Sequence, residues 1–233
     1  MMVNLFRPDT WFAQPHPLIA KNREAFARFN QSRPLAEYTF VVCDTELTGL
    51  DRKQDEIISI GAVLIRDLQI DLGATFHRYI RPKNIEHTKA TLVHQITPQQ
   101  LLTAPPLAEV LPAFVEFAGT SLMVGHCLTL DMDFLNRAAR KILGGTLANP
   151  GIDTIRLAQG YRRVRSGHFH DAEDDSRSYS LEDLSKEYNL PAFKPHDALE
   201  DAMQTAYLFL FLLKKFRKGG LLTLKEIYKA GRV

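Results

Sequence analysis

Residues 41–51 read VVCDTELTGLD, and this stretch decides how the rest of the chain is interpreted. Its apolar beginning is typical of a buried strand, yet the strand ends in two carboxylates, Asp44 and Glu46. Side chains at positions i and i+2 of a strand share one face and lie about 6.6 Å apart, so these two acids converge. They repel each other unless a cation lies between them. The pair alone indicates either a solvated strand end or half of a cation site.

The composition is that of an ordinary globular protein. The 233 residues are 45% hydrophobic and 24% charged, with a net charge of +2. One large domain with extensions can bury a sizeable core at this length. The small net charge means that any surface for nucleic acid has to be local. Cys43 and Cys127 lie in apolar surroundings, and we expect two small buried residues of a reducing compartment.

Nothing in the sequence indicates a membrane protein. No apolar run approaches the roughly 18 residues of a membrane span. Prolines and acids interrupt the first residues, MMVNLFRPDTWFAQPHP, so they do not read as a secretory signal. We therefore expect a cytoplasmic location and no membrane partner.

Strand patterns come first along the chain, and helical patterns follow. The first strands are separated by short turn-like segments, which favours an antiparallel meander. The later strands alternate with helices, so the whole order predicts an α/β domain with a mixed sheet. Strands are expected at 38–44, 57–66, 74–81, 122–125 and 152–154, and the main helices at 107–118, 131–143, 155–161 and 197–216.

Two segments flank the expected domain of residues 37–216, and a third interrupts it. Residues 1–36 read as an N-terminal extension with a short helix at 18–29, whose residues 25, 26 and 29 face the domain. Residues 162–179 are polar and charged, as in a surface loop or a partly disordered insertion. Residues 217–233 form a basic tail that is either solvated or available to nucleic acid or a protein partner.

Two further stretches place acids where they could join the first pair. In VGHCLTLDMDFLNR, residues 124–137, Asp131 falls near a helix start and precedes the core-facing Phe134 by about one turn, while Asp133 competes for the same role. In KPHDALED, residues 194–201, Pro195 keeps His196 outside the helix that Asp197 caps. His196 and Asp201 can converge only in that arrangement. Each stretch by itself also fits an ordinary helix start.

Taken together, these stretches resemble a known family. DTELTGLD, HCLTLDMDFL and HDALED are similar to the three motifs of the DnaQ-like (DEDDh) 3′–5′ exonucleases, which include the proofreading subunit of bacterial DNA polymerase III. The resemblance covers roughly residues 37–215 and includes DEIISIGAVLI at 55–65 and TLVHQITPQQL at 91–101. It implies an RNase H-like fold, a mixed five-stranded sheet flanked by helices.

The resemblance also implies an activity and a set of roles. The expected reaction is hydrolysis of phosphodiesters at single-stranded 3′ ends, with release of nucleoside monophosphates, DNA being favoured over RNA. Two Mg²⁺ or Mn²⁺ ions would neutralise charge and activate water, and His196 would be the general base. A DNA polymerase subunit could bind through the termini. The metal ligands would be Asp44, Glu46, Asp131 and Asp201, and substrate contacts would come from Thr45, Leu47, Thr48, His94, His126 and Phe134.

Two departures from the family pattern and three other functions bear on this interpretation. Cys127 stands where the family commonly has Asn, and Leu47 where polymerase-linked members commonly have Thr, which puts the substrate preference in doubt. An exoribonuclease on the same scaffold stays open, as does a non-catalytic module for nucleic acid or a polymerase. A missing acid would mark such a module, and no acid is missing. The His196–Asp197 pair also occurs in metal phosphohydrolases, but the other ligands of that class are not in place.

Overall fold

A five-stranded sheet forms the centre of the computed structural model, which describes residues 14–85, 90–166, 178–220 and 223–231. The strand order is β3-β2-β1-β4-β5, with the first three strands antiparallel and the last three parallel. The mixed α/β sheet predicted from the sequence is confirmed. The strands are β1 (Phe40–Leu47), β2 (Ile57–Arg66), β3 (Gln69–Tyr79), β4 (Leu122–Gly125) and β5 (Gly151–Asp153).

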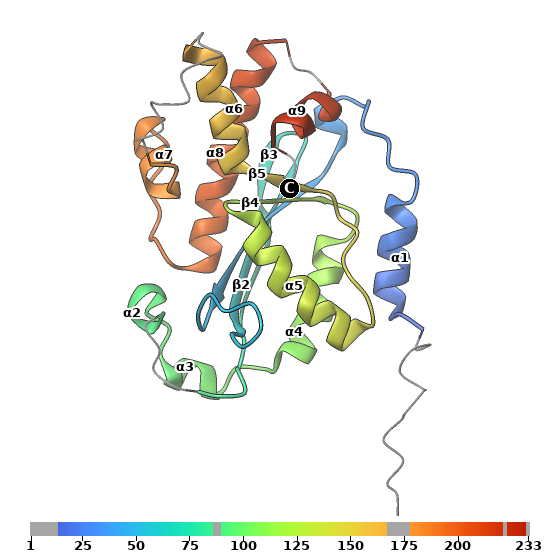
Figure 1. The fold of residues 1–233 in the computed structure, drawn as a ribbon, viewed down its shortest axis with the longest axis vertical. Helices are drawn as coiled ribbons and strands as arrows, with labels where there is room; N and C mark the ends of the chain where they lie inside the picture. Colours follow the sequence, from blue (N-terminus) through green and yellow to red (C-terminus); the bar gives the residue numbers. More distant parts are fainter. Residues whose placement is uncertain (1–13, 86–89, 167–177, 221–222, 232–233) are drawn as a thin grey trace, which may run out of the picture.

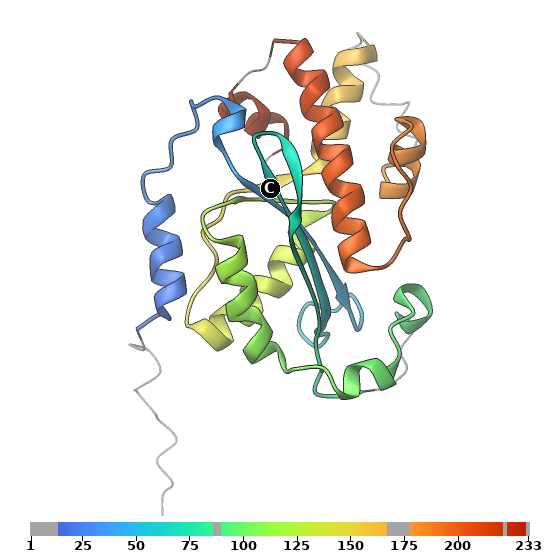
Figure 2. The same cartoon turned by 180° about the vertical axis from the view of Figure 1, so that it is seen from behind.

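Helices cover both faces of the sheet (Figures 1 and 2). Alternate residues of β1 serve opposite faces: Val41 and Cys43 pack in one core cluster, and Phe40 and Val42 in the other. Helices α4 (Leu107–Ala118) and α5 (Leu128–Leu143) complete the first cluster. Helices α6 (Thr154–Ser166), α7 (Leu181–Glu187), α8 (Ala198–Lys218) and α9 (Leu224–Gly231) lie on the second side.

A glycine lets α8 approach the sheet closely. Gly61 of β2 is paired with Asp44 of β1, and an added Cβ at Gly61 would lie 2.1 Å from the carbonyl carbon of Ala198. No side chain fits in that space. The backbone at the start of α8 therefore rests directly on β2, beside the residue of β1 that carries the first acid.

The β2–β3 connection is shorter than the sequence indicated. We expected a turn at 67–73 and a strand from residue 74, but β3 begins at Gln69. Asp67 and Leu68 form a two-residue turn with φ of 51° and 57°. Glycine or asparagine usually signals such a turn, and neither is present, so the pattern could not reveal it. The pairing of β2 with β3 also shifts register between Val63 and Leu64 of β2.

The N-terminal segment packs on the domain through a polar tie. Helix α1 (Pro17–Phe26) buries Ile19 and Asn22. Of the three residues predicted to face the domain, Ala25 is exposed, Phe26 is half-buried, and Phe29 packs against the second core cluster. The Asn22 amide donates to Asn149 Oδ1 at 2.6 Å, and its side-chain oxygen accepts from the backbone N–H of Ala148 at 2.7 Å. Three polar groups that would be orphaned in the core satisfy one another there. Residues 1–13 lie outside the described part of the chain.

The C-terminal segment holds a packed helix where we expected a basic tail. Leu224 and Ile227 on α9 are buried against the second core cluster, while Lys225 and Lys229 are exposed. The sequence LKEIYKAG is amphipathic, and tertiary packing stabilises a helix too short to be stable alone. Lys225 and Lys229 thus lie on the outer face of a helix that belongs to the fold, while Arg217 and Lys218 are the last residues of α8 and Arg232 lies outside the described part of the chain.

The remaining predictions concern two shorter regions. Helices α2 (Thr91–His94) and α3 (Pro98–Leu102) lie below the start of α8 in Figure 1, and Thr97 caps α3 through a capping box with Gln100. Helix α6 continues to Ser166, into the expected polar insertion, and residues 167–177 lie outside the described part of the chain. No helix among the described residues is both long and apolar enough to cross a membrane.

Candidate active site

Three carboxylates from two elements meet where β1 ends. Asp44 and Glu46 point from the same face of β1, and Asp201 comes from the first turn of α8. Each can place one carboxylate oxygen within 4.8 Å of the others. The β1 alternation brings the first two together, and the close approach of α8 over Gly61 brings the third.

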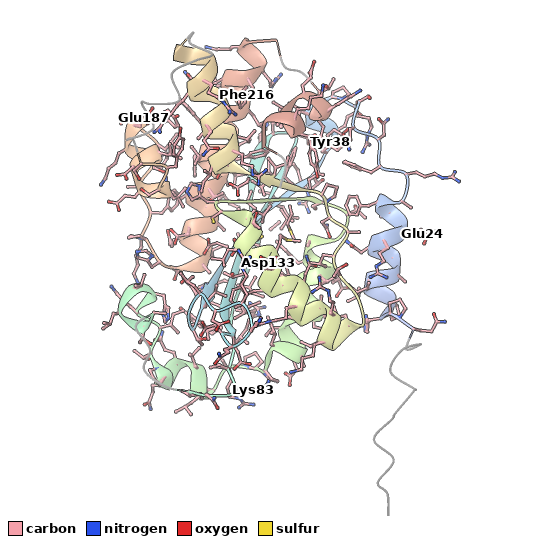
Figure 3. The ribbon with its side chains drawn as sticks, viewed as in Figure 1. Glu24, Tyr38, Lys83, Asp133, Glu187 and Phe216 are labelled. Atoms are coloured by element: carbon pink, nitrogen blue, oxygen red, sulfur yellow. The ribbon has the colours of Figure 1, made fainter. Side chains whose placement is uncertain are left out.

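Asp131 stands beside this group and is held by β1 itself. Its Oδ1 accepts hydrogen bonds from the backbone N–H of Thr45 at 3.0 Å and from the Thr45 hydroxyl at 2.6 Å. The side chain is only 5% exposed. Asp133, the competing acid, instead forms an ion pair with Arg52 on the surface near the start of α5 (Figure 3). The structure therefore brings Asp131, and not Asp133, to the other acids.

The acids raise one another's pKa values. Burial, followed by the charges of Asp201, Asp197 and Asp131, raises the pKa of Glu46 to about 7. Burial also raises the pKa of Asp131 to about 7, against the opposing effect of the Thr45 hydrogen bonds. The pKa of Asp44 lies well above its ordinary value, from burial and then from the neighbouring carboxylates. Such a cluster of shifted acids is typical of a functional site.

A divalent cation fits this donor set. Converging carboxylate oxygens are hard ligands of the kind that Mg²⁺ and Mn²⁺ prefer. The buried carboxylates repel one another when they are ionised, and a bound cation relieves that repulsion. Asp44, Glu46 and Asp201 can therefore hold a metal ion, with Asp131 positioned next to them.

His196 lies on the turn before α8, as its proline neighbour predicted. Its backbone has φ of 62°, in the left-handed region. Its backbone N–H donates to Asp201 Oδ2 at 2.9 Å, so the turn that presents the histidine also orients an acid. The side chain is exposed. The two residues converge although they are five positions apart, because only Asp201 is within the helix.

An open cavity of about 590 Å³ extends from the acids along α7. Asp44, His196 and Asp201 form one end of its lining, and His126 is also part of the wall. The ring nitrogens of His126 lie 2.9 Å from the Thr154 hydroxyl and 2.9 Å from the carbonyl oxygen of Tyr179. His126 therefore ties the wall of the cavity together, and its burial lowers its pKa.

Three residues expected to contact substrate are largely buried. Leu47 is 7% exposed and Phe134 is 1% exposed, both within the core cluster beneath α5. The apolar stripe of α5 turns Phe134 inward, because the same stripe has to cover the sheet. Thr45 is buried as well, and its hydroxyl is used to hold Asp131. In this conformation Leu47 and Phe134 pack in the core, and Thr45 positions Asp131.

The other two expected contacts, Thr48 and His94, line a small separate pocket. Thr48 donates its hydroxyl to Asp55 at 2.8 Å. His94 accepts from the backbone N–H of Ile96 through Nδ1, and its buried Nε2 has no hydrogen-bond partner among the described residues. Burial, and then the charge of His196, lowers the pKa of His94. That histidine is therefore neutral and near the catalytic candidates.

Two acids of the site were not assigned from the sequence. Asp153, at the end of β5, is buried, accepts from the backbone N–H of Ile155 at 2.8 Å and adds to the raised pKa of Asp131. Asp197 caps α8 and adds to the raised pKa of Glu46. Asp153 could have been found from the sequence, because it follows an apolar strand directly, as Asp44 does. Cys127 is exposed rather than buried, because it occupies the left-handed turn before α5.

Replacing Thr45 by Val tests how Asp131 is held. The change removes a charge-assisted hydrogen bond, which stabilises the ionised form of Asp131. We expect hydrolytic activity at neutral pH to fall about tenfold, since such a bond contributes roughly 1.5–3 kcal/mol. The acidic limb of the pH–rate profile should move to higher pH. Thr45→Ser keeps the hydroxyl and should retain the parent profile; a Val variant whose profile overlays the parent's would contradict this role.

The raised acids make the metal-free protein less stable as pH rises. The folded pKa of Glu46, about 7, exceeds its ordinary 4.5. Between those values the folded state keeps a proton that the unfolded chain has lost, so the free energy of unfolding falls with increasing pH. In EDTA, Tm should therefore decrease between about pH 5 and pH 7.5, and Mn²⁺ should restore it most at the higher pH. Glu46→Gln should flatten this dependence, and an unchanged slope in that variant would exclude Glu46 as its source.

Comparisons with known proteins identify the family. An exonuclease family model (RNase_T) matches residues 41–209. The chain is 31% identical over 199 residues to the DNA polymerase III subunit epsilon of Aquifex aeolicus, covering 84% of this chain and 92% of that protein. It is 36% identical to a PolC-type DNA polymerase III of Thermotoga petrophila over 81% of this chain, but spans only 13% of that protein's length.

Solved structures share the fold. Exonuclease X in complex with 5′ overhanging duplex DNA superposes with a TM-score of 0.58 at 23% identity, covering 81% of this chain and 99% of that one. The nuclease domain of 3′hExo, a DEDDh family member bound to rAMP, superposes with a TM-score of 0.61 at 18% identity, covering 76% and 93%. The predicted RNase H-like fold is thus confirmed. With its matched motifs and this arrangement, the chain belongs to the RNase_T exonuclease family and is a DnaQ-like exonuclease.

Proposed function

We propose that this exonuclease removes nucleoside monophosphates from single-stranded 3′ ends of DNA, and that it acts in proofreading or repair. The observation that carries the proposal is the convergence of Asp44, Glu46 and Asp201 next to Asp131. Phosphodiester hydrolysis needs charge neutralised on the phosphate, an activated water and a stabilised leaving oxygen. A carboxylate cluster beside an exposed histidine is suited to that reaction.

The proposed metal ligands are Asp44, Glu46, Asp131 and Asp201. When bound, two Mg²⁺ or Mn²⁺ ions would neutralise the negative charge of the carboxylates and of the substrate phosphate, and would lower the pKa of a water molecule. The protein's own contribution is to hold the acids together before any ion arrives. The Thr45 hydrogen bonds fix Asp131, and the His196 N–H fixes Asp201.

His196 is the proposed general base. Its ring is exposed at the cavity that Asp44 and Asp201 also line, so a water molecule placed between the acids lies within its neighbourhood. Histidine is the side chain that most often serves as a general base. The left-handed turn at His196 holds the ring outside the helix, where it can take up that proton and exchange it with solvent.

The proposed direction rests on the resemblance of the sequence motifs, and the substrate and the partner rest on the comparisons. The relatives are DNA polymerase III proteins, which supports DNA as the substrate, a polymerase as the partner and the cytoplasm as the location. Exonuclease I of E. coli, solved with a dT13 oligonucleotide, has the same fold with a TM-score of 0.64 at 20% identity, covering 79% of this chain and 42% of that one. The rAMP bound to 3′hExo makes RNA the competing substrate to test.

Single-stranded DNA and RNA oligonucleotides, each labelled at the 5′ end, test this function with Mg²⁺, with Mn²⁺ and with EDTA. We expect a ladder of products that shorten from the 3′ end on DNA, more slowly on RNA, and none in EDTA. His196→Ala should lower the rate about 10²-fold or more, the usual contribution of a general base. The exposed His16, the N-cap residue of α1, gives a matched control, and His16→Ala should retain the parent rate. A fully active His196→Ala would refute the mechanism, and an inactive parent on both polymers would refute the function.

A further inference from the structure

A second groove, of about 380 Å³, begins one helical turn beyond Asp131 on α5. Its walls come from α5, from the start of α4 and from the segments that precede β2 and follow β3. Its floor is apolar and includes Ile57, Phe134 and Ala138. It is separate from the cavity lined by Asp44 and His196, because the residues lining the two do not overlap.

The rim of this groove is strongly basic. We call Lys53, Arg81, Lys83, Arg137 and Lys141 the α5 basic rim. The one acid among the lining residues is Glu56, which accepts from the backbone N–H of Lys83 at 2.8 Å and lies 4.0 Å from its ammonium group. For a chain whose net charge is only +2, five cations against one acid is a local concentration of charge.

Two of the exposed lysines of the rim, Lys83 and Lys141, lie near each other. The neighbouring Lys83 lowers the pKa of Lys141 and is the largest cause of that shift, although Lys141 is fully exposed. Like charges placed this close repel each other unless an anion lies between them. Lys83 lies at the lower end of the molecule in Figure 3.

Arg137 is fixed in place without losing its charge. Its guanidinium donates to the carbonyl oxygens of Arg52 and Asp55, and lies 4.9 Å from the ring centre of Phe134. Carbonyl oxygens orient a guanidinium but do not neutralise it. A planar cation with fixed orientation at the groove's entrance suits a phosphate group.

We propose that the α5 basic rim binds the phosphodiester backbone of the substrate strand outside the catalytic cavity. The inference rests on the proposed function and deepens it, since it assigns the surface that holds the polymer. Helix α5 links the two places: Asp131 and Lys141 are ten residues apart, about 15 Å along the helix. A strand that reaches both has to be several nucleotides long.

The position of the rim on α5, the helix that carries Asp131, favours a nucleic acid over an acidic peptide. The cluster repels a polyanion, so long-range attraction has to come from another surface. The rim supplies it, and the apolar lining residues that reach the surface, Leu107, Ala108 and Ile142, can contact sugars and bases, as in other sites for single strands. If the rim instead bound an acidic peptide, removing the rim's charges would leave the affinity for nucleic acid unchanged.

The double variant Lys83→Gln/Lys141→Gln tests the inference in the full-length protein. In EDTA, where no hydrolysis occurs, we expect it to bind a fluorescent oligonucleotide of about 20 nucleotides about tenfold more weakly by anisotropy. The slope of log Kd against log salt should fall by about 1.4, that is, about 0.7 for each lost phosphate contact on a single strand. With Mg²⁺, kcat/KM on the oligonucleotide should fall similarly. Hydrolysis of p-nitrophenyl thymidine 5′-phosphate, too short to reach the rim, should be unchanged.

Lys21→Gln/Lys225→Gln is the matched control, since it removes the same charge from exposed positions on α1 and α9. It should leave the affinity and the salt slope of the parent. If the rim variant binds the oligonucleotide as tightly as the parent, or no more weakly than this control, the inference is overturned. Because the anisotropy measurement needs no catalysis, a parent that binds through the rim but hydrolyses neither substrate would refute the proposed function alone.

Discussion

Replacing Asp44 by Asn is expected to lower kcat/KM on a single-stranded oligonucleotide by about 10³-fold or more while leaving the fold intact. Metal-based charge stabilisation contributes several kcal/mol, and each 1.36 kcal/mol corresponds to about a factor of ten in rate. Asp44 is the acid on which the charges of Asp131, Asp201 and Glu46 all act, so it lies at the centre of the cluster. An amide of the same size cannot replace its charge.

The same substitution should stabilise the metal-free protein near neutral pH. Removing one buried acid relieves repulsion among the others, so the Tm of the Asp44→Asn variant in EDTA should exceed that of the parent, and added Mn²⁺ should raise it less. Asp133→Asn is the control: Asp133 lies on the same helix as Asp131 but pairs with Arg52 at the surface. Its activity should stay within about threefold, as for a surface pair. Asp44→Asn with more than a tenth of the parent activity would contradict the assignment.

Replacing Gly61 by Ala is expected to have the next largest effect, although Gly61 touches no substrate. The new methyl carbon would lie 2.1–2.2 Å from the backbone of Ala198 and Leu199. Backbone cannot rotate away, so α8 has to shift and carry Asp201 and His196 with it. A displacement near 1 Å at a catalytic group can cost about 10²-fold in rate. Overpacking of this kind also costs about 1–3 kcal/mol of stability.

Two measurements separate the shift of α8 from unfolding. Circular dichroism and Tm report whether Gly61→Ala folds, and Mn²⁺ affinity reports whether Asp201 still reaches Asp44. We expect a folded protein with weakened metal binding and impaired hydrolysis. Gly73→Ala, at a position in β3 where an added Cβ meets only Asp71 Oδ1 at 3.4 Å, should behave as the parent. A folded Gly61→Ala protein with unchanged kcat/KM would show that the close contact does not position the site.

The sequence was most informative where short-range patterns carry the structure. The apolar run before Asp44 predicted a strand, and its two-residue period placed Asp44 and Glu46 on one face. Pro195 and the Asp197 cap predicted that His196 lies outside the helix, which allowed it to meet Asp201. Each of these inferences depends on neighbours within a few residues, where backbone geometry leaves few choices.

The remainder depended on contacts between distant segments. The choice of Asp131 over Asp133 is made by Thr45, 86 residues away. The burial of Leu224 and Ile227, which turns an expected tail into a packed helix, depends on partners across the sheet. Patterns along one segment do not contain this information. Leu47 is a different case: it neighbours the acids in sequence, but the alternation of β1 places it on the opposite face with Val41 and Cys43, where it packs in the core.

Calorimetric titration with Mn²⁺ at about pH 7.5, where the acids of the site release their protons, tests the central claim most directly. Parent, Asp201→Asn and Asp133→Asn are titrated, and hydrolysis of the same oligonucleotide is followed in each titrated sample. We predict two ions and full activity for the parent and for Asp133→Asn, and fewer ions with no hydrolysis for a folded Asp201→Asn. Asp201→Asn that binds Mn²⁺ and hydrolyses DNA as the parent does would contradict the claim that these carboxylates form the metal-dependent catalytic centre.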